Sequence, residues 1–195
     1  MAAAVLCLTL MEALLKLAAL GLPPLLAITI RMVIGVLMLT PWILRAGVRS
    51  LKTERFATHF WRGLVGYLGL ATFILAVTQL PLADVTAISF SRPLWAILIA
   101  AIVLGEAFNM RRGVATLIGF AGVLIMVRPG GAIETATLLA LAHSVLSALT
   151  IIYVRLLSST EPPLRIMVYH QSLSVLFGLG PSMYYWLTPG LESLL

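Results

Sequence analysis

The chain has 195 residues, of which 61% are hydrophobic and 10% are charged, and its mean hydropathy is +1.08. A soluble domain of this length cannot hide so much apolar surface, so the composition places the chain among membrane proteins. The net charge of +6 does not indicate a nucleic-acid-binding protein, because the basic residues cluster between apolar stretches. Cys7 is the single cysteine, which excludes an intrachain disulfide, and we expect no metal and no other cofactor.

Seven apolar stretches are candidates for membrane-spanning helices, each of which needs about 20 residues. The runs are continuous and show no period-2 alternation, which favours helices over a β-barrel. The predicted fold class is therefore an all-α membrane protein, a polytopic helical bundle. The predicted spans are residues 3–21, 25–44, 63–80, 84–104, 113–128, 136–154 and 164–187.

The Lys and Arg residues of the connecting segments predict the orientation. With a cytoplasmic N-terminus, the cytoplasmic segments hold nine of them, in residues 45–62, 105–112 and 155–165. The outer segments hold none, although Arg128 borders one of them. We therefore expect a multi-pass protein of a bacterial inner membrane. Segment 45–62 also contains Phe56, Phe60 and Trp61, and two interpretations stay open: an interfacial helix on the inner surface, or a solvated basic loop.

Small residues recur at helical spacing in two of the predicted spans. Gly63, Gly66 and Gly69 are spaced by three, and Ala115 and Gly119 are spaced by four. Such residues let the backbones of membrane helices approach closely. We therefore expect both sets to pack against neighbouring helices.

One segment recurs in register 139 residues later. Lys16-Leu17, Pro23-Pro24-Leu25 and Arg31 are matched by the segments Arg155-Leu156, Pro162-Pro163-Leu164 and His170. Five spans separate the two copies, so the second unit is inverted relative to the first, an arrangement typical of secondary transporters. The predicted units are a five-helix unit, residues 1–131, and the first two helices of an inverted repeat, residues 132–195. The second unit is short of three helices, so either the chain is a truncated product or fragment, or a partner supplies the rest.

Several short motifs follow one another in a characteristic order over most of residues 1–131. They are Glu12-Ala13-Leu14-Leu15-Lys16, Leu22-Pro23-Pro24 with Arg31, Leu80-Pro81-Leu82-Ala83-Asp84 with Pro93, Leu104-Gly105-Glu106, Gly119-Phe120-Ala121-Gly122-Val123-Leu124 and Arg128-Pro129-Gly130. This order resembles the EamA-type transporters of the drug/metabolite transporter superfamily, and is similar to the bacterial group that includes S-adenosylmethionine uptake proteins. The resemblance implies ten helices in two inverted five-helix units, and the import or export of small metabolites.

Charged residues inside the predicted spans are the first candidates for a substrate or ion pathway. A charge at a helix centre costs about 2.5–3.5 kcal/mol to insert, so partners, water or function must offset it. Glu12 and Lys16 share one helix face, and are either an ion pair or a proton or cation site tuned by the lysine. With Lys16, the positive charges of Arg31 and Arg92 favour an anionic or carboxylate-bearing substrate. Alternatively, Arg31 snorkels or pairs with Glu12, and Arg92 bonds to backbone carbonyls.

The fourth span contains a proline next to polar residues. Pro93 removes one helical hydrogen bond, blocks another and leaves carbonyls free near Ser89. The segment from Ser89 through Ser91 and Arg92 to Pro93 is therefore a candidate binding element, and a simple packing kink is the alternative. His143 and His170 lie inside the sixth and seventh spans, and each is either a pathway residue or a hydrogen-bonded structural histidine.

These observations predict a secondary transporter, or permease, that moves a small polar or anionic metabolite by alternating access. The alternative is a truncated or non-transporting membrane subunit that needs a partner. An enzyme is not expected, because the chain has neither an HExxH nor a GxSxG motif. The expected partners are the metabolite, the lipid bilayer and a second copy or complementary chain. The candidate pathway residues are Glu12, Lys16, Arg31, Ser89, Ser91, Arg92, Pro93, His143 and His170.

Overall fold

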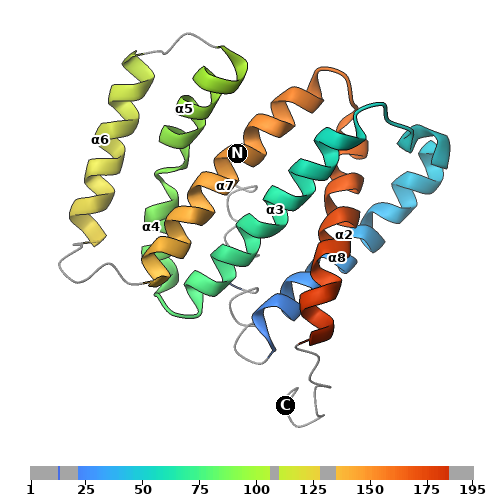
Figure 1. Ribbon diagram of the computed structural model, residues 1–195, viewed down its shortest axis with the longest axis horizontal. Coiled ribbons are helices and arrows are strands. Elements are labelled where there is room, and N and C mark those ends of the chain that lie inside the picture. The colour runs from blue at the N-terminus through green and yellow to red at the C-terminus, as the bar shows by residue number, and fades with distance from the viewer. Residues whose placement is uncertain (1–12, 14–21, 106–109, 128–134, 185–195) are drawn as a thin grey trace.

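The computed structural model describes residue 13 and residues 22–105, 110–127 and 135–184 (Figure 1). Nearly all of these residues are helical and none of them is in a β-strand. The predicted all-α fold is thus confirmed, whereas the predicted first span, residues 3–21, lies outside the described residues except for Ala13. The elements are α2 (Pro24–Ala46), a short 3₁₀ helix η1 (Val48–Leu51), α3 (Phe56–Val77), α4 (Leu82–Ser89), α5 (Arg92–Leu104), α6 (Met110–Val127), α7 (Thr135–Ser158) and α8 (Pro163–Tyr184).

The helices are long enough and apolar enough for a membrane. Four stretches meet both conditions within the described part of the chain: α2, α3, α4 with α5, and α7, with mean hydropathies between 1.6 and 1.9. Many large apolar side chains point outward from these helices, among them Leu37, Met38, Leu44 and Ile102. Outward-facing apolar side chains are what lipid-facing helices require. The chain is therefore a polytopic membrane protein.

Helix α3 lies between α7 and α8 and packs along both (Figure 1). Helix α2 packs against α8, and α5 packs against the other side of α7, with α6 outermost. Successive spans run in opposite directions, with α4 and α5 together forming one span, so segments 47–55 and 159–162 lie at the same end of the bundle (Figure 1). We call this the basic end, because the Arg and Lys residues of segments 45–55 and 155–165 lie there.

Helix α3 begins seven residues earlier than predicted, at Phe56 instead of residue 63. Arg62, which the sequence analysis counted as a loop charge, lies inside this helix and is only 7% exposed. Its Nη1 donates a hydrogen bond to the carbonyl of Ile166 at 3.2 Å, and His59 stacks on Tyr169 with ring centroids 4.4 Å apart. These contacts with α8 extend the helix. Segment 45–62 is consequently not a loop throughout, since residues 56–62 belong to α3 and two of them, His59 and Arg62, are buried.

Glycines bring α3 close to both neighbours, as predicted. A Cβ atom on Gly66 would lie 2.5 Å from Cε1 of His170, and one on Gly63 would lie 2.8 Å from Cβ of Leu173. On the other side of α3, a Cβ on Gly69 would lie 3.3 Å from Cβ of Leu146 in α7. By contrast, no described atom lies within 4 Å of a Cβ built on Gly119, so this glycine does not mark a helix contact in the described part of the chain.

The contact between Gly66 and His170 makes a stability prediction. The variant Gly66→Ala must displace the His170 ring or separate α3 from α8, which we expect to cost about 1–3 kcal/mol. The matched control is Gly180→Ala, because the added methyl group on α8 would meet no described atom within 4 Å. Unfolding of both variants in detergent micelles measures the difference. Equal stability of the two variants would contradict the close approach.

Candidate functional site

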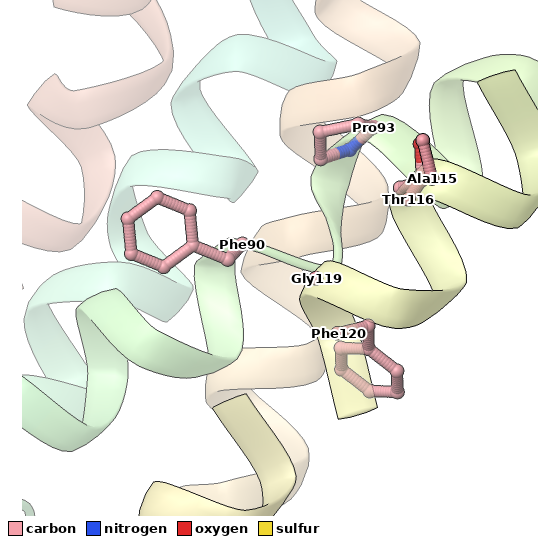
Figure 2. Close-up of a pocket in the computed structure, with 6 residues that line it drawn as sticks. All are labelled: Phe90, Pro93, Ala115, Thr116, Gly119 and Phe120. Carbon is pink, nitrogen blue, oxygen red and sulfur yellow. The ribbon is translucent and has the colours of Figure 1, made fainter. Parts of the chain in front are cut away.

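The span over Leu82–Leu104 is not one continuous helix. Helix α4 ends at Ser89 and α5 begins at Arg92, with Pro93 in its first turn (Figure 2). Across the break, the amides of Phe90 and Ser91 donate to the carbonyls of Ala87 and Ile88, both at 3.0 Å. These i to i−3 bonds are tighter than those of an α-helix. The interruption predicted at Pro93 is therefore present, at the place where the proline cannot donate a hydrogen bond.

The break is held against α7 by a pair of buried serines. Ser91 is 1% exposed and Ser144 is 0% exposed, and their Oγ atoms are 2.6 Å apart. The indole Nε1 of Trp95 also donates to Oγ of Ser91 at 3.2 Å. The Ser91 hydroxyl thus links the turn between α4 and α5 to α5 through Trp95 and to α7 through Ser144. Because apolar surroundings offer no water to replace these partners, the contact fixes where the break lies.

His143, the residue before Ser144, links the break to α3. Its Nδ1 lies 2.7 Å from the carbonyl oxygen of Gly69. Since a carbonyl oxygen only accepts hydrogen bonds, Nδ1 carries a proton, and Nε2 of the neutral ring is left to accept. Nη2 of Arg92 lies 3.4 Å from this Nε2. We call Ser91, Arg92, His143 and Ser144 the helix-break cluster.

Two apolar cavities adjoin the helix-break cluster. One has a volume of about 430 Å³ and lies between the break and α6, lined by Phe90, Pro93, Ala115, Thr116, Gly119 and Phe120 (Figure 2). The other has a volume of about 300 Å³ and reaches Ser91 between α5 and α6. Cavities of this size suit a small ligand or part of one. Polar groups of the cluster and an apolar cavity therefore meet at Ser91.

The structure brings together only some of the predicted pathway residues. Ser91, Arg92 and His143 are neighbours, and Pro93 makes the break beside them. Ser89 is different, because its Oγ donates to the carbonyl of Val85 in its own helix at 2.8 Å. Glu12 and Lys16 lie outside the described residues.

His170 belongs to a second polar group, on the other side of α3 from His143. It lies against Gly66, and its ring is close enough to Arg31 and Arg62 for their charges to act on it. In the repeat, Arg31 and His170 occupy matching positions on α2 and α8. Arg31 and His170 are thus near each other, but they are separated by α3 from the helix-break cluster.

Sequence reasoning missed a group of polar contacts at the basic end. Glu161, in the turn before α8, is 7% exposed and accepts hydrogen bonds from Oγ1 of Thr53 and Nη1 of Arg165, both at 2.6 Å. Nε2 of His59 lies 3.9 Å from the same carboxylate. Tyr169, which stacks on His59, donates its hydroxyl to the carbonyl of Leu51 at 3.0 Å. We call Thr53, His59, Glu161, Arg165 and Tyr169 the latch.

The charge state of Glu161 follows from its surroundings. Burial raises the pKa of this carboxyl, but the hydrogen bonds from Thr53 and Arg165 and the positive charges of Arg165 and His59 lower it by more. The pKa therefore lies below its ordinary value of 4.5. The one sequence signal for this site is an isolated acidic residue between the basic residues Arg155 and Arg165.

Comparison with known proteins identifies the class. Residues 1–128 match the model of the EamA-like transporter family, which is well over half of the chain. The chain therefore belongs to the EamA-like transporter family, within the drug/metabolite transporter superfamily. The resemblance seen in the order of the sequence motifs is confirmed.

The chain is also similar to individual relatives and to a solved structure. It is 29% identical over 154 residues to an S-adenosylmethionine uptake transporter of Rickettsia prowazekii (strain Madrid E), a match covering 78% of this chain and 52% of the relative. It is 30% identical over 173 residues to a riboflavin transporter of Brucella anthropi, a match covering 88% of this chain and 60% of the relative. The chain thus spans little more than half the length of these curated relatives. A crystal structure 20% identical in sequence superposes with a TM-score of 0.64 over 94% of this chain and 68% of the other, which shows a shared fold.

The serine pair can be tested by a double-mutant cycle. We expect Ser91→Ala and Ser144→Ala to be coupled by about 1 kcal/mol, because interhelical hydrogen bonds in membrane proteins are worth about 0.6–1.7 kcal/mol. Thr150→Ala is the matched control on α7, since its hydroxyl donates only to the carbonyl of Leu146 in the same helix. Denaturant unfolding in mixed micelles gives the four stabilities of each cycle. Additive effects of the two serine substitutions would contradict the contact.

The lowered pKa of Glu161 predicts how the stability depends on pH. A carboxyl whose pKa is lower in the folded state contributes stability above its unfolded value, and loses it as the pH falls through the folded value. The wild type should therefore be more stable than Glu161→Gln at neutral pH, and this advantage should disappear below pH 4.5. The control is Glu54→Gln, which removes an exposed carboxylate next to Thr53 at the same end of the bundle. An advantage that persists in acid would refute the assignment.

Proposed function

We propose that the protein is a permease, a secondary transporter that moves a small polar or anionic metabolite across the membrane by alternating access. The observation that carries this proposal is the break between α4 and α5, with its polar cluster against α7. Helix α4 has eight residues, so the break lies about 12 Å along a span that crosses a hydrocarbon core of about 30 Å. Non-helical backbone at that depth is tolerated where it is buried in protein or faces a cavity, and transporters use such breaks to bind substrates.

The helix-break cluster offers groups of the right kind for a polar ligand. The guanidinium of Arg92 is a fork of donors that suits a carboxylate or phosphate, and His143 presents Nε2 toward it. This arginine makes the helix-break cluster positive, which favours an anionic substrate group, and Arg31 and Lys16 are the proposed positive residues elsewhere along the route. The apolar cavity at Ser91 accommodates the remainder of the molecule. Glu12 is the proposed proton or cation site.

The predicted repeat gives the proposal its mechanical basis. Residues 1–131 are the proposed first five-helix unit, and residues 132–195 are the proposed partial second unit, inverted and with two helices. Helices α2 and α8 are the matching helices that begin with the two Pro-Pro pairs. Their packing against each other, with Arg31 near His170, supports this division. In the proposed orientation the basic end faces the cytoplasm of a bacterial cell. The S-adenosylmethionine and riboflavin relatives are named as transporters and not as enzymes, which supports the proposal that this protein is not an enzyme.

A second candidate is a membrane subunit that does not transport alone. The specific observation in its favour is that the match covers 52% of the S-adenosylmethionine uptake transporter and 60% of the riboflavin transporter. In this case a second copy or a complementary chain would complete the route. The two candidates differ in whether this chain by itself supports flux.

Flux measurements on proteoliposomes test the proposal, with S-adenosylmethionine and riboflavin as probes because two relatives carry these names. For a probe that is taken up, Arg92→Gln should raise the half-saturating concentration about ten- to hundredfold, as expected for the loss of one charge-assisted hydrogen bond. Arg111→Gln, at the exposed start of α6, is the control. Equal effects of the two substitutions would remove Arg92 from the route, and absence of flux from the chain alone would favour the second candidate.

A further inference from the structure

The contact between α3 and α8 contains buried polar atoms that lack hydrogen-bond partners. In the described part of the chain, α3 contributes Nδ1 of His59, Nε of Arg62 and the hydroxyl of Tyr67. Helix α8 contributes Nδ1 of His170 and Oγ of Ser174. Each of these atoms has lost water without gaining a partner, which costs free energy. Contact with water would relieve this cost, so the packed arrangement is unfavourable for these groups taken alone.

At the centre of the contact, glycines of α3 receive side chains of α8. Gly63 and Gly66 of α3 face Leu173 and His170 of α8, with no side chain of α3 standing between them. Interlocking side chains resist separation, because they must change rotamer when helices move apart. The ring of Phe60 interlocks with α8 in this way, but α3 has no such side chain at the two glycines. The α3–α8 contact therefore combines polar atoms that favour hydration with a stretch in which α3 offers no interlocking side chain.

The latch opposes this separation at the basic end. Glu161 accepts a hydrogen bond from Thr53 of segment 47–55, and Nε of Arg165 donates to the carbonyl of Ser50 in the same segment at 2.7 Å. With Tyr169 bonded to Leu51 and stacked on His59, these contacts tie the start of α8 to segment 47–55 and to α3. Figure 1 shows η1 and the start of α8 at the same end of the bundle. The latch joins parts of the chain more than 100 residues apart.

The other end of α8 is fixed to a different helix. Oγ of Ser182 lies 2.6 Å from Oγ1 of Thr29 in α2, and both residues are buried. Gly178, one turn earlier, leaves room for the side chain of Thr29. Helix α8 thus packs along α2, where Gly35 faces Gln171 and Thr29 is bonded to Ser182, and the latch ties its start to α3 and segment 47–55. Release of the latch alone would let the start of α8 move away from α3 while the Ser182 end stays bonded to α2.

We infer that the α3–α8 contact is a gate at the basic end, that the latch holds it shut, and that the Thr29–Ser182 pair is its pivot. The inference rests on the proposed function, because it assigns the moving part of that transporter. Opening admits water to His170 and Ser174 and leads toward Arg31. Arg62 lies within the gate, where its bond to the carbonyl of Ile166 must break as the helices part.

Thiol labelling tests the gate without any transport assay. Cys7→Ala removes the single native cysteine, and Ser174→Cys places a nearly isosteric thiol at a position that is 0% exposed. We expect a charged, membrane-impermeant methanethiosulfonate reagent to label this thiol slowly in nanodiscs. Glu161→Gln should speed labelling about ten- to hundredfold, the factor for losing a charge-assisted hydrogen bond. Glu54→Gln, which removes an exposed charge from segment 47–55 at the same end of the bundle, should leave the rate unchanged.

A second variant and a second measurement guard against a folding defect. Thr53→Val removes one hydrogen bond to Glu161 from outside the helices, and should speed labelling in the same direction. Hydrogen exchange followed by mass spectrometry should rise over residues 163–174 in both latch variants, while residues 178–184 near the pivot stay protected. Equal increases over both parts of α8 would indicate general loosening and overturn the gate.

The outcomes separate this inference from the proposed function. Faster labelling in the latch variants without flux of either probe would keep the gate and count against transport by this chain. Flux of a probe together with an unchanged labelling rate in Glu161→Gln and Thr53→Val would keep the function and overturn the gate. Faster labelling in Glu54→Gln as well would also overturn it, because the effect would then follow charge and not the latch.

Discussion

The close approach of α3 to two neighbours is the constraint on which the rest of the structure depends. In a bilayer no hydrophobic force draws helices together, so contact depends on close packing and on hydrogen bonds between helices. Gly66 allows close packing of α3 against α8. Gly69 allows close packing against α7, and its carbonyl also accepts a hydrogen bond from His143 of α7. Glycines three residues apart therefore let two different helices, α8 with His170 and α7 with His143, approach α3 closely. Each histidine in turn belongs to a separate polar group among the described residues.

Features that depend on local chemistry were predictable from the sequence. Proline cannot donate a backbone hydrogen bond, so the break beside Pro93 follows from one residue, and apolar length located α7 within a few residues of its observed ends, Thr135–Ser158. Pairings between helices were not predictable, because they depend on how each helix is rotated about its axis. Nearly uniform apolar faces carry little information about that rotation. The sequence therefore did not indicate that Ser91 meets Ser144, or that Ser89 bonds within its own helix.

The error in the predicted start of α3 also arose because a contact between helices could not be predicted from the sequence. Charge marks the ends of membrane spans on average, and Arg62 was accordingly assigned to a loop. In the folded chain its guanidinium has a backbone acceptor in α8, so the charge is buried and the helix continues past it. Glu161 escaped notice for the related reason that its partners, Thr53 and His59, are about 100 residues away in the sequence. The buried charges of Arg62 and Glu161 thus depend on contacts between residues about 100 positions apart in the sequence.

The division of one span into α4 and α5 has a consequence for the lipid environment. A straight helix adapts to a thicker or thinner bilayer by tilting as a rigid rod. Two short helices joined at Phe90 and Ser91 can instead change the angle between them, and Ser91 would pass that change to α7 through Ser144. Acyl-chain length thereby acts on the geometry around Arg92 and His143. Membrane thickness would thus affect the geometry of the helix-break cluster as well as the insertion of the helices.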